Sequence, residues 1–288
     1  MGKAYMVAGV LLCLLAAPCR GVAAAQAVGG AGIAPVAASP APAVPAAVGA
    51  VFAALSLAYP DAAMSLDIAA DGYYARLGNG ARLLVQPLEG CPSWLADDPA
   101  HVGQDPPLCA LFAQPYTRGE GGKNPAPDVD PGRVRNEALL KALYGGDAAA
   151  VRRQCEVVEF LGERLLFNSA HGAAAALRRV AARVAALAAE DPSIARFVKP
   201  LAGTFCWRVI SATRRLSAHS FAVAIDLNTR TGLYWQWSRH LSAQEVLAAR
   251  EAYPQALIDA FEQEGFVWGG KWAHYDLMHF EYRPELLR

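Results

Sequence analysis

Two histidines and two aspartates in the C-terminal part of the chain constrain most strongly what this sequence can fold into and do. Asp226 follows His219 by seven residues, and Asp276 precedes His279 by three. Two imidazoles and one carboxylate form a ligand set that suits zinc in a site with an open coordination position. The second carboxylate is then placed to activate a water molecule. Each residue alone is usually structural, but together they predict a hydrolytic zinc site.

The residues around this set indicate two strands. Apolar side chains alternate with small ones between His219 and Asp226, which predicts a half-buried strand over 217–227 with room for an ion above its alanines. A second short strand is predicted over 278–282, because aromatic residues there alternate with polar ones. Asp276 would then lie at a bend just before that strand, where a base that is not a metal ligand can sit.

Two longer stretches carry a family resemblance. Residues 217–226, SAHSFAVAID, resemble the S-x-H-x-x-G-x-A-x-D motif of zinc-dependent D-alanyl-D-alanine carboxypeptidases and L-alanyl-D-glutamate endopeptidases of bacterial cell walls. Residues 265–272, GFVWGGKW, and 276–286, DLMHFEYRPEL, are similar to the closing segment of the same family. The resemblance is strong over 202–286 and extends more loosely upstream to about Tyr59.

The resemblance implies roles for individual residues. His219, Asp226 and His279 correspond to the zinc ligands, and Asp276 corresponds to the general base. Arg208 stands where the family tends to carry an arginine before its first ligand, and such a cation could hold the scissile carbonyl oxygen or a substrate carboxylate.

Three further residues belong to the predicted site. Ser217 is expected to contact the substrate or support a ligand, and Glu281 is expected to orient a ligand through a hydrogen bond. Ala222 replaces the glycine that follows the first histidine in the family motif. Its methyl group is expected to narrow the pocket, which would affect substrate fit more than catalysis.

The N-terminal part of the chain has the pattern of an exported protein. Residues 1–25 combine a Lys-bearing start, a short apolar run and an Ala-rich end, which is typical of a secretory signal peptide, with a retained anchor as the alternative. Residues 26–50 are rich in Ala and Pro and predict a flexible spacer. The peptidase domain is expected over 51–288, with its motif-bearing core at about 200–288.

Charge and export together limit the partners. The chain has 26 basic and 26 acidic residues and a formal net charge of zero. Without a basic excess, phosphate-driven binding of nucleic acid is not expected. A periplasmic or secreted location is predicted, with no stable membrane insertion once the signal is cleaved.

Four cysteines remain after the predicted signal peptide: Cys91, Cys109, Cys155 and Cys206. An even number in an oxidising compartment allows two disulfides in three pairings, and buried free thiols are the alternative. A bond between Cys91 and Cys109 is favoured, because it would close a Pro-rich loop that has no predicted structure of its own.

Periodicity predicts an α+β domain with an antiparallel sheet floor that carries the zinc site and is flanked by helices. Helices are expected over 136–144 and 173–189, and Ser242 and Glu245 form a capping-box pattern that begins another. A further helical segment should follow Pro254 and close at Gly265. Strands are expected over 205–210, 217–227, 233–237 and 278–282.

Several other residues have two interpretations. His274 lies near the predicted base and is expected to support the site or to lie on the surface. Arg133 and Arg135 could bind a peptide carboxylate or could form salt bridges within a turn. The tryptophans of the C-terminal part could form a glycan-stacking surface, but packing in the core and pocket wall is favoured.

The predicted zinc site, together with the family resemblance, implies a zinc metallopeptidase that acts on peptidoglycan stem peptides. The carboxypeptidase activity is favoured, because the chain offers arginines for the terminal carboxylate of a substrate. An endopeptidase using the same site remains open, as do a zinc-dependent amidase on the same scaffold and a non-catalytic wall-binding module that keeps zinc for structure. An intact Asp276 and a free coordination position speak against the last of these.

Overall fold

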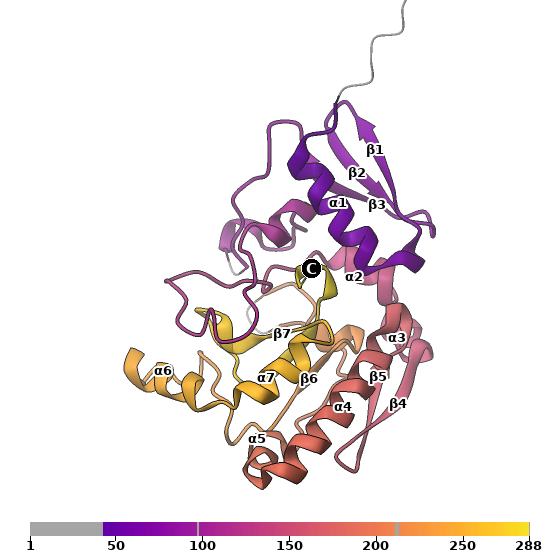
Figure 1. Ribbon diagram of the computed structural model, residues 1–288. Coiled ribbons are helices and arrows are strands. Elements are labelled where there is room, and N and C mark those ends of the chain that lie inside the picture. Colours follow the sequence, from indigo (N-terminus) through magenta and orange to yellow (C-terminus); the bar gives the residue numbers. More distant parts are fainter. Residues whose placement is uncertain (1–42, 97, 211–212, 288) are drawn as a thin grey trace, which may run out of the picture. The chain divides into compact units, whose positions relative to one another are not determined.

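The computed structural model describes residues 43–96, 98–210 and 213–287 (Figure 1). The predicted signal peptide and most of the predicted spacer lie outside these residues. Helix α1 (Ala46–Ala58) occupies the end of that spacer, because Val48, Val51 and Leu55 bury one side of the helix in the core. The described fold therefore begins before the predicted domain boundary at residue 51.

An antiparallel three-stranded sheet follows α1 in the chain. Its strands are β1 (Ser65–Ala69), β2 (Gly72–Arg76) and β3 (Arg82–Pro87), in that order. Helix α1 packs against β3 and against the C-terminal turn η8 (Pro284–Leu286). The Tyr59 hydroxyl, just after α1, donates a hydrogen bond to Glu285 at 2.6 Å. The two ends of the described chain are thus held together.

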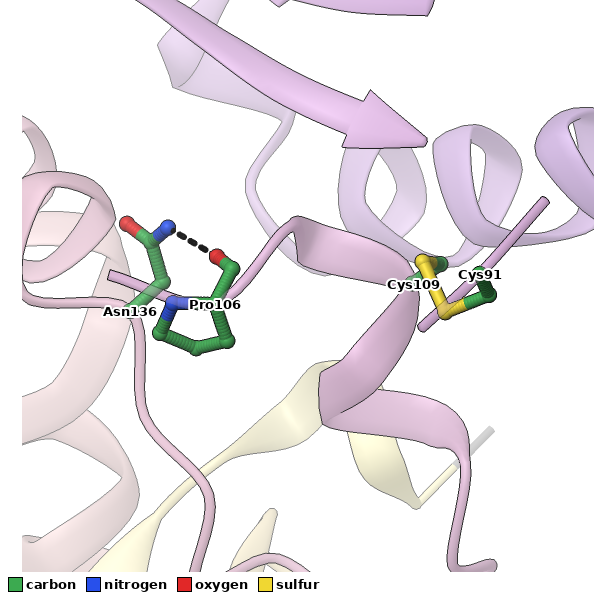
Figure 2. Close-up of a disulfide and its surroundings, with 4 residues drawn as sticks. All are labelled: Cys91, Pro106, Cys109 and Asn136. Carbon is green, nitrogen blue, oxygen red and sulfur yellow. Dashed lines mark hydrogen bonds between the residues drawn. A yellow bond between two sulfur atoms is a disulfide. The ribbon is translucent and has the colours of Figure 1, made fainter. Parts of the chain in front are cut away.

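The long segment after β3 is closed by a disulfide (Figure 2). Cys91 is bonded to Cys109 at a Cα–Cα distance of 6.0 Å, which confirms the favoured pairing. Cys155 and Cys206 are free thiols, so a second disulfide is absent from the described residues. The segment contains the short turns η2 (Pro99–His101) and η3 (Leu108–Phe112).

The central part of the chain is a helix-rich layer. Helix α2 (Glu137–Tyr144) is capped by Asn136, whose side chain accepts a hydrogen bond from Leu139 N. The same side chain donates a hydrogen bond to Pro106 O at 2.7 Å (Figure 2). The elements that follow are α3 (Ala148–Gln154), the hairpin β4 (Cys155–Phe160) and β5 (Glu163–Asn168), and helix α4 (Ala173–Glu190). Helix α4 packs against this hairpin with the apolar face that its periodicity predicted.

The C-terminal sheet carries the candidate site. Its strands lie in the order β6 (Ala224–Asp226), β8 (His279–Tyr282), β7 (Phe266–Trp268), and both pairs are antiparallel. Helix α6 (Ala243–Ala252) has the predicted capping box, and α7 (Gln255–Glu262) packs between α4 and β7. The α+β class with an antiparallel sheet beneath the site is confirmed.

Short helical turns complete the described chain: η1 (Pro60–Ala62), η4 (Ala170–Gly172), η5 (Pro192–Ile194), α5 (Ala195–Val198), η6 (Ala218–Phe221) and η7 (Gly269–Lys271). Within the described ranges, no helix has the length and apolar character needed to cross a membrane.

Three strand predictions need correction. Segments 205–210 and 233–237 are not strands, and each contains a single isolated bridge, Val209–Leu216 or Tyr234–Asp276. Of segment 217–227, only β6 is a strand. A pattern of apolar residues does not by itself supply a neighbouring strand with matching register, so these segments form turns and isolated bridges instead.

Candidate metal centre and its cavity

His219 lies on the turn η6 and not at the entry of a strand. Ser217 begins this turn, and its hydroxyl accepts a hydrogen bond from the His219 backbone N–H at 3.4 Å. The turn ends at Ala222, which has a left-handed backbone with φ 54°. A tight helical turn followed by a reversal lets the chain present His219 and then continue into β6.

The left-handed conformation of residue 222 explains why the motif has a glycine three residues after its first histidine. Glycine adopts a positive φ without the steric cost of a Cβ. Ala222 is fully buried in the core, and its carbonyl accepts a hydrogen bond from Asn168 N at 2.8 Å. It does not line the cavity described below. The expectation that its methyl group narrows the pocket is therefore wrong, and the substitution acts on the backbone.

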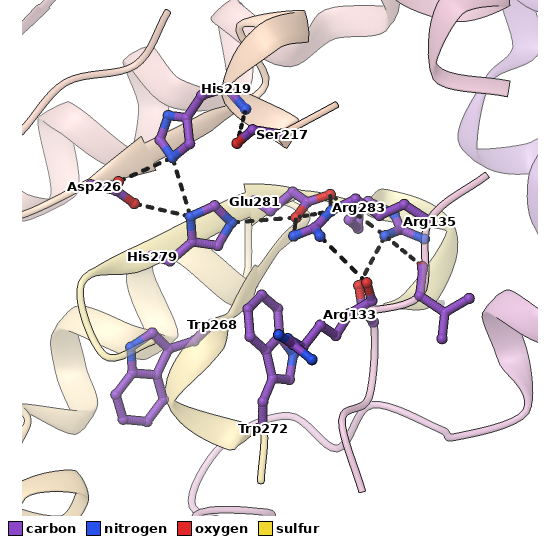
Figure 3. A network of polar contacts seen from close by, with 12 residues as sticks. Arg133, Arg135, Ser217, His219, Asp226, Trp268, Trp272, His279, Glu281 and Arg283 are labelled. Carbon is purple, nitrogen blue, oxygen red and sulfur yellow. Dashed lines mark hydrogen bonds and ion pairs between the residues drawn. The ribbon is translucent and has the colours of Figure 1, made fainter. Parts of the chain in front are cut away.

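Sheet register brings the second and third predicted ligands together. Asp226 pairs with His279 across β6 and β8. The distance from His279 Nδ1 to Asp226 Oδ1 is 2.9 Å, and His219 Nε2 lies 3.1 Å from Asp226 Oδ2 and 3.3 Å from His279 Nδ1 (Figure 3). One ligand atom from each of the three residues lies within 4.8 Å of the other two.

The outer nitrogens of both imidazoles have partners. His219 Nδ1 lies 2.8 Å from the Thr204 carbonyl oxygen, which can only accept a hydrogen bond, so Nε2 carries the lone pair that faces the cluster. His279 Nε2 lies 3.3 Å from Glu281 Oε2, which leaves Nδ1 facing inward (Figure 3). Hydrogen bonds of this kind orient histidines that bind metal ions.

Glu281 is in turn held by two arginines. Its carboxylate is fully buried and accepts hydrogen bonds from Arg135 Nε at 2.8 Å to each oxygen. Arg283 approaches the same carboxylate at 3.5 Å. Burial alone would raise the pKa of Glu281, but Arg135, His279 and Arg283 hold it well below its ordinary value. Of the two roles that the sequence allowed for Arg135, the structure therefore shows the salt bridge.

Electrostatics favour a cation among the three predicted ligands. Burial alone would raise the pKa of Asp226, but His219 and His279 hold it well below its ordinary value. Burial alone would lower the pKa of His279, whereas hydrogen bonds with Asp226 and Glu281 raise it to about 9. The cluster therefore keeps its carboxylate ionised and attracts positive charge, either a proton or a metal ion.

The donor set fits zinc. Ligands about 2.1 Å from a tetrahedral zinc ion are separated by about 3.4 Å. The separations of 2.9–3.3 Å among the side chains are close to this value, so His219, Asp226 and His279 could hold the ion after a small outward adjustment.

Asp276 lies in the same cavity and outside the ligand cluster. Its backbone N–H donates to Gly269 O at 3.0 Å, and a Cβ on Gly269 would lie 2.6 Å from the Asp276 carbonyl oxygen, so this close approach requires glycine. Asp276 Oδ1 is shielded from solvent and has no hydrogen-bond partner among the described residues. Burial, together with the charge of Asp226, raises the pKa of Asp276 to about 6.

The cavity above the cluster has a volume of about 320 Å³. Arg208, Ser217 and Asp276 line it together with the three predicted ligands. Trp237 also lines it, with 69% of its surface exposed. The cavity thus brings together the predicted site residues except Glu281, which lies behind His279, and Ala222, which is buried in the core.

The cavity wall includes residues to which the sequence gave two interpretations or none. His274 lines the cavity, with its Nδ1 2.7 Å from Asp130 Oδ2 and its backbone N–H donating to Asp130 Oδ1. Trp272 and Tyr234 form other parts of the wall. Packing of Trp272 in the pocket wall agrees with the favoured sequence interpretation of the tryptophans.

The fold and the site together define an α+β domain with a metal-binding group of two histidines and one aspartate above an antiparallel sheet. Residues 211–282 match the family model described as D-alanyl-D-alanine carboxypeptidase. The match confirms, over these residues, the family resemblance predicted from the sequence. Searches of curated proteins and of solved structures gave no match for the chain.

Proposed function

We propose that this protein is a zinc-dependent peptidase that removes the terminal D-alanine from peptidoglycan stem peptides. The observation that carries the proposal is the convergence of His219 Nε2, Asp226 and His279 Nδ1 in a cavity that also contains Asp276. The match of residues 211–282 to a carboxypeptidase family supports a peptidase of this general kind.

His219, Asp226 and His279 hold the zinc ion in this proposal. When bound, the ion supplies Lewis-acid polarisation of the scissile carbonyl and activation of water. The hydrogen bonds to Thr204 and Glu281 keep the two imidazoles oriented toward the ion.

Asp276 is the general base. It removes a proton from the attacking water and then delivers it to the leaving amine. A carboxyl whose pKa is raised to about 6 is ionised at neutral pH and still returns a proton readily, which suits this double role. Its solvent-shielded Oδ1 lacks a competing partner among the described residues.

Arg208 binds the terminal carboxylate of the substrate. Its side chain is exposed, lines the cavity, and makes no hydrogen bond or ion pair with any described residue, so it is available for an anion. Arg135 cannot take this role while it holds Glu281. A free cation beside the metal group therefore favours a carboxypeptidase over an endopeptidase.

The proposed substrate implies export, with residues 1–25 as a cleaved signal peptide and a periplasmic or secreted mature protein. The decisive experiment is incubation of the zinc-loaded protein with purified muropeptides, followed by mass analysis. Loss of one alanine from pentapeptide stems is the expected result. Cleavage between L-alanine and D-glutamate would establish an endopeptidase instead, and unchanged muropeptides would contradict the proposal.

A further inference from the structure

A second cavity adjoins the candidate metal centre. It has a volume of about 220 Å³ and shares four wall residues with the first cavity: Arg133, Ile210, Tyr234 and Gln236. Its remaining wall includes Trp94, which stacks on His101 with ring centroids 3.8 Å apart, and Arg214. The two cavities therefore adjoin at these four residues.

Two paired segments, 208–210 and 213–217, contribute to both cavities. The bridge Val209–Leu216 and the hydrogen bonds from Ile210 N to Arg215 O and from Ser217 N to Arg208 O join them. Arg208 lies beside the metal centre, and Arg214 lies in the second cavity. Ser217 leads directly into the turn that carries His219.

Most charged groups of the second cavity are already engaged. Asp98 caps η2 by accepting a hydrogen bond from Ala100 N and lies 3.7 Å from His101. Arg133 lies 3.6 Å from Asp130, and Arg215 also has a partner. Arg214 differs from these, because its exposed side chain has no hydrogen bond or ion pair with any described residue.

We propose that Arg214 binds a second carboxylate of the substrate, upstream of the terminal carboxylate that Arg208 binds. The two arginines line adjoining cavities, and each has an exposed side chain without a partner among the described residues. This inference rests on the proposed function, since Arg208 and the metal centre define where the peptide ends.

The test uses peptides that end in D-alanyl-D-alanine and carry one glutamate at successive positions before that pair. Each peptide has a counterpart with glutamine at the same position, which keeps size and hydrogen bonding but removes the charge. The zinc-loaded protein is compared with the variants Arg214→Gln and Arg164→Gln. Arg164 is an exposed arginine of β5 that lies outside both cavities, so its variant is the matched control for loss of one positive charge.

The expected result is a KM roughly tenfold lower for the glutamate peptide than for its glutamine counterpart at the position that reaches Arg214. Arg214→Gln should abolish this preference, and Arg164→Gln should retain it. Equal KM values for both peptides at every position, or a preference that survives in Arg214→Gln, would overturn the inference. If no peptide is hydrolysed, the proposed function fails, and the affinities of the same peptides for the wild-type and Arg214→Gln proteins still decide the inference.

Discussion

Asp226 and His279 are paired across two antiparallel strands, with 2.9 Å between Oδ1 and Nδ1. The metal centre is therefore a property of the sheet register. A shift of one residue would move either side chain to the opposite face of the sheet. The third candidate ligand, His219, depends on a separate element, the turn η6.

The first prediction separates metal binding from proton transfer. His219→Ala and His279→Ala should lose most bound zinc and all measurable peptidase activity, because only two candidate ligands remain. Asp276→Asn should retain zinc but lose a factor of about 10²–10⁴ in kcat, the usual share of general acid–base catalysis. Elemental analysis and muropeptide hydrolysis measure the two effects.

His240→Ala is the control for these variants, because His240 is exposed and does not line the cavity. Loss of zinc from Asp276→Asn would make Asp276 a ligand. Full activity in that variant would require another base.

The second prediction concerns the support behind His279. Glu281→Gln removes the negative charge that orients His279 and pairs with Arg135. The affinity for zinc should therefore fall by about 10–100-fold. Competition with a chelator measures this affinity, and circular dichroism verifies folding. The exposed Glu159→Gln variant should bind zinc as the wild type does. A folded Glu281→Gln protein with unchanged affinity would contradict the role assigned to Glu281.

The third prediction compares two buried alanines, Ala222 and Ala224. Replacement by glycine removes a buried methyl group, worth about 0.8 kcal/mol, at either position. At Ala222 it also relieves a left-handed backbone that costs a residue with a Cβ about 1–2 kcal/mol. Urea denaturation should therefore find Ala222→Gly about 1–2 kcal/mol more stable than Ala224→Gly. Equal stabilities would exclude strain at Ala222.

A fourth prediction concerns the disulfide between Cys91 and Cys109. Replacing both cysteines by alanine should lower the free energy of unfolding by about 3 kcal/mol, because the bond closes a loop with a sequence separation of 18. Cys206→Ala should have little effect, since Cys206 is exposed and unbonded. Chemical denaturation of the wild type, the double variant and Cys206→Ala measures these free energies. A double variant as stable as the wild type would contradict the prediction.

The fifth prediction uses the free thiol of Cys155. Burial raises its pKa to about 11, so the folded protein carries a neutral thiol there at pH 8. Alkylation of Cys155 by iodoacetamide should therefore be slow at pH 8 and increase about tenfold per pH unit until the pH approaches 11. Peptide mass analysis after timed alkylation follows this site, with denatured protein as the reference. Rapid labelling of the folded protein at pH 8 would contradict the assigned burial.

The sequence alone indicated much of the local structure. Helices α2 and α4 have strong apolar periodicity and clear ends, and the capping box of α6 depends only on residues close in the chain. These signals are local, and the structure confirms them. The motif residues also identified which side chains gather in one cavity, because a metal-binding set has few interchangeable residue types.

Only the tertiary structure decided the conformation of the segments between these elements and the partners of the site. The alternation before Asp226 predicted a long strand, but the contacts of η6 and the reversal at Ala222 shorten it to β6. Likewise, the contact between Arg135 and Glu281 joins residues 146 positions apart. Pairings of this kind arise when distant segments pack together, so their physical cause lies outside any local stretch of sequence.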